Sequence, residues 1–169
     1  MSAENLRGSS VSVVCSDARE AETAPALDLP RWEHLASTAL VAEGAVGELT
    51  VTFIDRDEMT RLNEEHMAQM GPTDVLSFPL DDDPLPGVPT LLGDVVISPS
   101  VAATQAPEHA GTVDDEIALL VVHGILHVLG HDHAEPDETA AMQARERTLL
   151  EEHHWTGPAP AGFRQTHDV

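Results

Sequence analysis

The stretch IALLVVHGILHVL, residues 117–129, is apolar around its whole circumference as a helix, apart from His123 and His127. A helix of this kind has to be buried, so it predicts a central helix with the other elements packed around it. Residues four apart project from the same face of a helix, which places the two imidazoles side by side. Polar side chains in an apolar interior need partners. The pattern therefore predicts a buried helix that carries part of a metal site.

The residues on either side of this stretch predict where the helix begins and ends. Thr112 is followed three residues later by Asp115, a pattern close to the capping box that marks a helix N-terminus. Gly130 follows the last apolar residue, where a glycine in the left-handed conformation would end the helix and reverse the chain. We therefore expect a helix from Thr112 to about Leu129, and then a turn that returns His133 to the same metal ion.

The spacing of three histidines, His123, His127 and His133, is that of a tridentate zinc site. Three neutral imidazoles and one open position are the arrangement of catalytic zinc, which activates a bound water near neutral pH. Zinc suits three imidazoles, and nickel, copper or cobalt would fit a similar site. We predict one Zn²⁺ ion on these histidines, with Asp132 and Glu116 as the candidate carboxylates that orient them.

Position 124 separates this motif from zinc peptidases. Peptidases of the metzincin type share the spacing, but carry a glutamate after the first histidine that takes the proton from zinc-bound water. Gly124 has no side chain and cannot be that base, which disfavours peptide hydrolysis. A glycine inside a helix costs about 1 kcal/mol relative to alanine, so close packing or close approach of a ligand is expected here. A phosphodiester remains a suitable substrate, because a metal can supply hydroxide and neutralise phosphoryl charge.

The rest of the chain predicts a small sheet and further helices. We expect strands at 11–15, 48–55, 74–80 and 93–98, and helices at 30–43, 56–67, from about Pro99 and at 136–154. The acidic, proline-rich composition of segment 81–89 predicts an exposed loop. These elements predict an α+β fold with a small mixed sheet of about four strands and a zincin-like central helix. Residues 1–155 form its single domain, and 156–169 have the composition of a flexible tail.

The composition limits the possible binding partners and the cellular compartment of the protein. Eight arginines, no lysine and thirty acidic residues give a net charge of −22, which repels nucleic acid at long range. A nucleic-acid role therefore needs a local site that overrides the global charge. No apolar run approaches about 18 residues and the first residues lack an apolar secretory core, so no membrane span and a cytoplasmic location are expected. Cys15, the single cysteine, excludes an intramolecular disulfide and is expected to be a small core residue rather than a nucleophile.

Four blocks of sequence stand out along the chain: PTDVLSFPL (72–80), GDVVIS (93–98), DDEIALLVVHGILH (114–127) and HGILHVLGHDH (123–133). The last is similar to HGxLHxxGYDH, the signature of the YbeY family, the endoribonucleases of ribosomal RNA maturation. The other three resemble further blocks of that family in the same order. The similarity covers about residues 48–150, and four ordered blocks are far more specific than the histidines alone.

The resemblance implies a mixed sheet of about four strands with helices, and one zinc ion held by His123, His127 and His133. It implies cleavage of single-stranded RNA, 3′-end maturation of small-subunit ribosomal RNA and ribosome quality control. The implied partners are ribosomal RNA, the small ribosomal subunit and its assembly factors, with no DNA and no membrane.

The chain departs from the family pattern at two positions. LNEEHM (62–67) matches the block LNxxYR only at its first two positions, so Met67 stands where the family has an arginine. Arg61 lies almost two turns earlier and could replace the family arginine only through a different geometry. This departure therefore concerns the positive charge that orients RNA and not the metal site. His131 stands where the family has a tyrosine, and is an exposed turn residue, a proton shuttle or an extra polar contact.

Further side chains are candidates for support of the site, each with a structural alternative. Asp74 either orients a ligand or satisfies backbone donors at a strand start, and Ser77 either lines the cleft or is buried structure. Asp132 and His131 are the other two candidates. Met142 and Glu146 on the last helix also resemble family positions, and packing or capping accounts for them.

Three functions stay open from the sequence. The first is a zinc-dependent endoribonuclease. The second is a zinc metallopeptidase-like hydrolase, supported by the histidine spacing and opposed by Gly124. The third is a non-enzymatic ribosome assembly factor with structural zinc, which the open coordination position opposes because structural zinc normally has four protein ligands.

Overall fold

The computed structural model describes residues 10–80, 90–131 and 134–165. The predicted loop 81–89 and the candidates Asp132 and His133 therefore lie outside the described residues. The described elements are, in chain order, β1 (Val11–Asp17), α2 (Leu29–Ala42), β2 (Gly47–Phe53), α3 (Arg56–Met67), β3 (Val75–Pro79), β4 (Leu91–Ile97), α4 (Pro99–Gln105), the short 3-10 helix η1 (Ala106–Glu108), α5 (Val113–Val128) and α6 (Pro136–His153).

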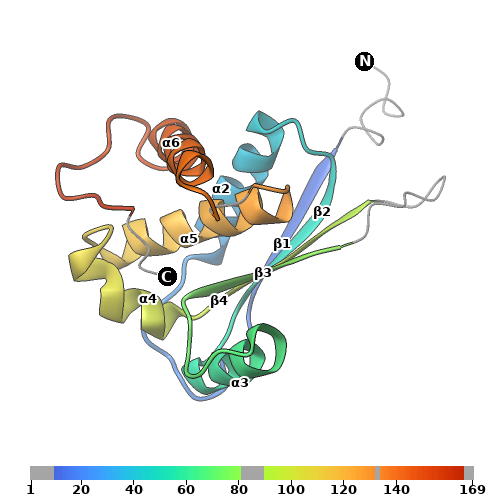
Figure 1. The fold of residues 1–169 in the computed structure, drawn as a ribbon, viewed down its shortest axis with the longest axis vertical. Helices are drawn as coiled ribbons and strands as arrows, with labels where there is room; N and C mark the ends of the chain where they lie inside the picture. Colours follow the sequence, from blue (N-terminus) through green and yellow to red (C-terminus); the bar gives the residue numbers. More distant parts are fainter. Residues whose placement is uncertain (1–9, 81–89, 132–133, 166–169) are drawn as a thin grey trace.

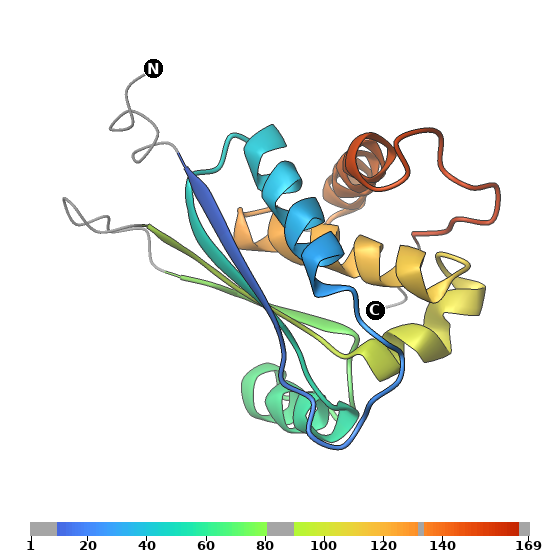
Figure 2. The same ribbon diagram turned by 180° about the vertical axis from the view of Figure 1, so that it is seen from behind.

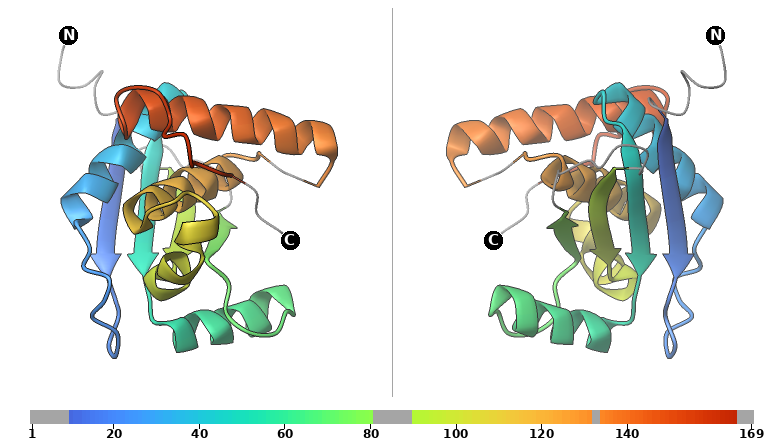
Figure 3. Two further views of the ribbon diagram at one scale, coloured as in Figure 1. Left: turned by 90° about the vertical axis from the view of Figure 1, so that its left-hand side faces the viewer. Right: turned by 90° about the vertical axis from the view of Figure 1, so that its right-hand side faces the viewer.

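The four strands form one mixed sheet in the order β1-β2-β4-β3. β1, β2 and β4 are parallel, and β3 runs antiparallel to β4 at the edge. Helices α2, α5 and α6 lie on one side of the sheet and α3 lies on the other (Figures 1 and 2). Figure 3 shows α6 and α3 at opposite ends of the molecule. The predicted α+β class with a four-stranded mixed sheet is confirmed.

Helix α5 is the centre of the core, as its all-round apolar sequence predicts. From Glu116 to Leu126 every side chain is buried. The Thr112 hydroxyl accepts a hydrogen bond from the Asp115 backbone N–H at 3.1 Å, so the predicted cap is present. Gly130 has a φ of +104°, the left-handed conformation that ends the helix. The sheet and the helices α2 and α6 complete the core around α5.

A second, smaller apolar cluster lies under α3 on the other face of the sheet. Ile54 and Met59 pack there against Leu76 of β3 and Val96 of β4. This burial explains why an otherwise polar helix stays attached to the sheet. The strand alternation separates the two clusters, because successive side chains point to opposite faces.

The end of α6 continues into a segment packed against the domain. Within the stretch 156–169, expected to be a flexible tail, the structure describes residues up to 165. Phe163 is only 8% exposed, and its ring meets Trp155 edge-on with ring centroids 4.8 Å apart. No helix of the described residues has both the length and the apolar character needed to cross a membrane.

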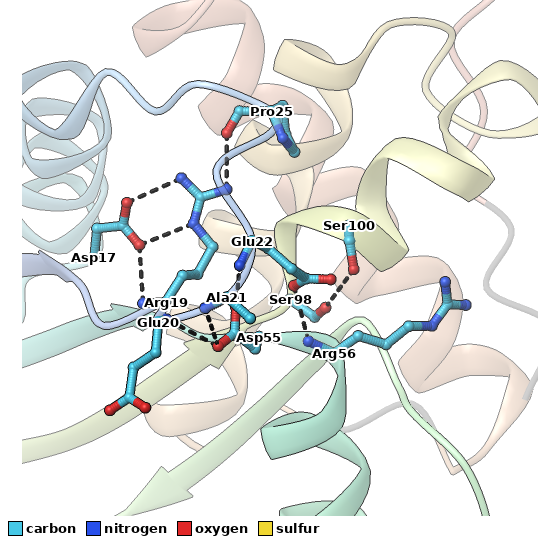
Figure 4. Close-up of polar contacts among 10 residues, drawn as sticks. All are labelled: Asp17, Arg19, Glu20, Ala21, Glu22, Pro25, Asp55, Arg56, Ser98 and Ser100. Carbon is cyan, nitrogen blue, oxygen red and sulfur yellow. Dashed lines mark hydrogen bonds and ion pairs between the residues drawn. The ribbon is translucent and has the colours of Figure 1, made fainter.

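Asp55, just before α3, ties the loop after β1 to the start of this helix (Figure 4). The Asp55 carboxylate accepts the backbone N–H groups of Glu20 at 2.8 Å, Ala21 at 3.1 Å and Glu22 at 3.0 Å. At the end of β1, both oxygens of Asp17 accept hydrogen bonds from the guanidinium of Arg19, in the same loop, at 2.9 Å. Each carboxylate is thus bonded in its ionised form.

These bonds make the stability of the fold depend on acid pH. The Arg19 guanidinium lowers the pKa of Asp17, and the Glu20 N–H and its neighbours lower the pKa of Asp55. Folded-state pKa values below the ordinary aspartate value of 3.8 stabilise the fold at higher pH, and this stabilisation is lost as the pH falls through them. We expect Asp55→Asn to lower the free energy of unfolding at pH 7 and to approach the wild type near pH 3.

Urea unfolding from pH 3 to pH 7 checks this expectation. Glu64→Gln, at an exposed position of the same helix beyond its first turn, is the control and should change the free energy of unfolding less than Asp55→Asn. A constant difference between Asp55→Asn and the wild type over the whole pH range would contradict the linkage.

Candidate metal centre

His123 and His127 lie one turn apart on α5, as the sequence predicts. Their rings meet edge-on, with centroids 4.6 Å apart and an interplanar angle of 77°. His123 is buried and His127 is half-buried. Among the described residues no group of three or more His, Cys, Asp or Glu side chains forms a metal-binding set, and the third predicted ligand, His133, is not among these residues.

A buried carboxylate on α6 holds the first histidine. Oε2 of Glu146 lies 2.6 Å from Nδ1 of His123, and Glu146 is 1% exposed. Glu116, predicted for such a role, instead faces His109, whose Nδ1 lies 3.1 Å from its Oε1. Of the two carboxylates, it is therefore Glu146, and not the predicted Glu116, that contacts His123. Its sequence signal is an acidic residue on the inward side of α6, between Met142 and the buried Leu149.

The donors present here fit a metal ion. A carboxylate at Nδ1 of His123 favours the tautomer with its proton on that nitrogen, which leaves the Nε2 lone pair for a cation. A carboxylate behind a histidine is the usual support of zinc-ligating imidazoles. A second imidazole, that of His127, stands beside the first. Imidazole donors of this kind suit zinc.

Gly124, between the two histidines, packs tightly against the sheet. A Cβ atom on this residue would stand 2.5 Å from Cγ1 of Val95 on β4 and 3.3 Å from Oγ of Ser77 on β3. The Ser77 hydroxyl donates a hydrogen bond to the Gly124 carbonyl at 3.2 Å. The glycine is explained by close packing, one of its two predicted reasons. Ser77 is a packing contact between β3 and α5.

Asp74 links the beginning of β3 to α4. Its Oδ1 accepts the Val75 backbone N–H at 2.8 Å, and its Oδ2 accepts the side-chain amide of Gln105 at 2.7 Å. Asp74 therefore satisfies a backbone donor at the start of the strand, as its structural alternative predicts.

The two departures from the family pattern are on the surface. Met67, at the end of α3, is 51% exposed. The guanidinium of Arg61 pairs with Glu58 one turn earlier on the same helix, so it is engaged on α3 itself. The side chain of His131 is 40% exposed, and its Nε2 lies 3.6 Å from a carboxylate oxygen of Glu43.

A cavity of about 480 Å³ lies on the α3 side of the sheet. Its lining includes Glu58 and His66 of α3, Phe78 of β3 and Asp94 of β4. The His66 ring meets Phe78 edge-on at 5.4 Å between centroids. The two histidines of α5 are not part of this lining, so the cavity is separate from the candidate metal centre.

The single cysteine has no nucleophilic character. Burial, with Glu33 as a lesser cause, raises the pKa of Cys15 to about 12. A thiol with this pKa stays protonated near neutral pH and is inert as a nucleophile. This agrees with the prediction of a small core residue.

Comparisons with known proteins point to one family. A family model described as "Endoribonuclease YbeY" matches residues 18–154. The Endoribonuclease YbeY of Mycolicibacterium gilvum is 49% identical over 113 residues, which are 62% of this chain and 63% of that protein. The Endoribonuclease YbeY of Nocardia farcinica is 43% identical over 139 residues, 75% of this chain and 74% of that protein. The match thus spans less than two thirds of the first relative's length.

The fold is also similar to a solved structure. The solution structure of TM1509 from Thermotoga maritima superimposes with a TM-score of 0.56 at 25% sequence identity. The superposition covers 83% of this chain and 87% of that one. The similarity therefore extends over most of both chains.

Proposed function

Because this chain belongs to the endoribonuclease YbeY family, we propose that it is a zinc-dependent endoribonuclease acting on single-stranded RNA. The proposed reaction belongs to the 3′-end maturation of small-subunit ribosomal RNA and to ribosome quality control. The observation that carries the proposal is the pair His123–Glu146, a buried histidine held by a buried carboxylate beside a second histidine. Burial of a carboxylate in an apolar core costs free energy, so its presence there indicates a functional role.

In this proposal His123 and His127 of α5 hold the zinc ion, and His133 of the sequence motif is the third ligand. The bound ion would supply Lewis acidity and a hydroxide nucleophile near neutral pH. Glu146 keeps the Nδ1 proton of His123 in place, so that the other ring nitrogen stays free for the ion. The packing at Gly124 leaves no space for a side chain that could act as the general base of a peptidase.

The charge of the chain favours an RNA substrate presented by the ribosome. Several arginines are already engaged with carboxylates, among them Arg31 with Asp114 and Arg145 with Glu43. A chain with a net charge of −22 therefore has little free positive surface with which to attract RNA. We propose that the small ribosomal subunit and its assembly factors position the RNA, and that the protein acts in the cytoplasm.

An RNA-cleavage assay with a peptide counterpart tests the proposed function. We expect the zinc-loaded protein to cleave a single-stranded precursor of the small-subunit rRNA 3′ end, and to leave the same RNA in duplex form and casein intact. A chelator should stop the reaction, and added zinc should restore it. Cleavage of casein, or RNA cleavage that persists in the metal-free protein, would overturn the proposal.

A further inference from the structure

The segment that follows α6 returns to the domain and is fixed just before Gln165. Phe163 is buried, and its ring packs against Trp155. The next residue, Arg164, donates its backbone N–H to the carbonyl of His109 at 3.0 Å. Two successive residues are thus anchored, which gives the backbone at Gln165 a defined position.

Gln165 and Gln143 of α6 form a reciprocal pair. The side-chain amide of Gln165 donates to the backbone carbonyl of Gln143 at 2.7 Å. The side-chain amide of Gln143 donates to the backbone carbonyl of Gln165 at 3.3 Å. This pair holds the amide of Gln165 against the helix that carries Glu146.

The same amide of Gln165 reaches the buried carboxylate. Its Nε2 lies 3.2 Å from Oε1 of Glu146, while the other carboxylate oxygen faces Nδ1 of His123 at 2.6 Å. An amide group has two hydrogens to donate, and here one serves Gln143 and the other serves Glu146. Among the residues that the structure describes, each oxygen of Glu146 therefore has one hydrogen-bond partner, His123 for Oε2 and Gln165 for Oε1.

A carboxylate that is 1% exposed has almost no water to stabilise its charge. Each donor offsets part of the desolvation cost and restricts rotation of the carboxylate plane. Within the described part of the chain, loss of Gln165 would leave Glu146 with the hydrogen bond to His123.

We propose that Gln165 is a positioning residue of the metal centre, which fixes the orientation of His123 through Glu146. This inference rests on the zinc site of the proposed function. It connects the last described residue of the chain to a metal ligand through two hydrogen bonds.

Zinc affinity of the full chain, measured by competition with a chromophoric chelator, tests the inference. Gln165→Met keeps the length and most of the packing of the side chain and removes its donors. We expect its zinc affinity to fall by about 3- to 10-fold, less than the about 10- to 100-fold typical for loss of a direct carboxylate partner. The control is Gln105→Met, which removes an equivalent amide–carboxylate bond, to Asp74, and should leave zinc affinity unchanged. Melting curves of both variants verify that the fold is kept.

A double-mutant cycle with Glu146→Gln separates positioning from general support of the fold. If Gln165 acts through Glu146, Gln165→Met lowers zinc affinity in the wild-type chain and has no further effect in the Glu146→Gln chain. Equal losses in both backgrounds, or an unchanged affinity of Gln165→Met, would overturn the inference and leave the zinc site standing. A wild-type chain that binds no zinc would overturn both the inference and the zinc site.

Discussion

Glu146→Gln is expected to lower the affinity for zinc by about 10- to 100-fold, the usual effect of losing a carboxylate that supports a metal-bound histidine. The variant keeps the size of the side chain but removes its charge. A neutral amide beside Nδ1 of His123 holds the ring proton less firmly than the carboxylate at 2.6 Å, so the ring orientation and tautomer are less defined. Chelator competition measures the change.

Glu152→Gln is the matched control for this substitution, because Glu152 is exposed on the same helix. Its zinc affinity should equal that of the wild type. If Glu146→Gln and Glu152→Gln bound zinc equally well, the buried pair would have no part in metal binding. The pair would then be explained by packing alone.

Gly124→Ala is expected to lower the free energy of unfolding by about 1 to 3 kcal/mol, as is typical for an extra methyl group in a well-packed core. Alanine is the better helix former by about 1 kcal/mol, so propensity alone predicts the opposite sign. The steric contact outweighs helix propensity, because the new Cβ would stand 2.5 Å from Cγ1 of Val95. Valine is branched at Cβ and cannot swing its methyl groups away freely.

Val95→Ala provides the control for this contact. With the valine methyl groups removed, Gly124→Ala should cost nothing or become stabilising, which urea unfolding of the four chains measures. A single variant Gly124→Ala as stable as the wild type would contradict the packing explanation. Gly124→Glu should be far more damaging, so it cannot serve to restore a peptidase.

Local signals in the sequence predicted the central helix and its ends. An all-round apolar run, a capping threonine and a terminal glycine each act within a few residues, so Thr112 and Gly130 have the predicted roles. The strand at 48–55 followed from alternation of polar and apolar residues, and the observed ends of all four strands differ from the predicted ends by at most two residues. The predicted strand 74–80 is observed as Val75–Pro79, and the carboxylate of the preceding Asp74 accepts the Val75 backbone N–H.

The carboxylate behind His123 could not be assigned from local signals. Glu116 lies seven residues before His123 on the same helix. A sequence pattern can pair the two residues only by their closeness along the chain. In the fold it lies in the first turn of α5 and faces His109. Glu146 is brought to His123 by the packing of α6 on α5, which is a tertiary contact. Gln165 reaches Glu146 through another tertiary contact, from a segment whose composition is that of a flexible tail.

Zinc content and RNA cleavage, measured on the same preparations of the wild type and His127→Ala, test the proposed metal-dependent endoribonuclease most directly. His34→Ala, which changes an exposed histidine on α2, is the control. The wild type and His34→Ala should bind one zinc ion per chain and cleave single-stranded RNA in proportion to the zinc bound, whereas His127→Ala should lose both. RNA cleavage by His127→Ala at the wild-type rate, or cleavage that does not follow zinc content, would contradict the proposal.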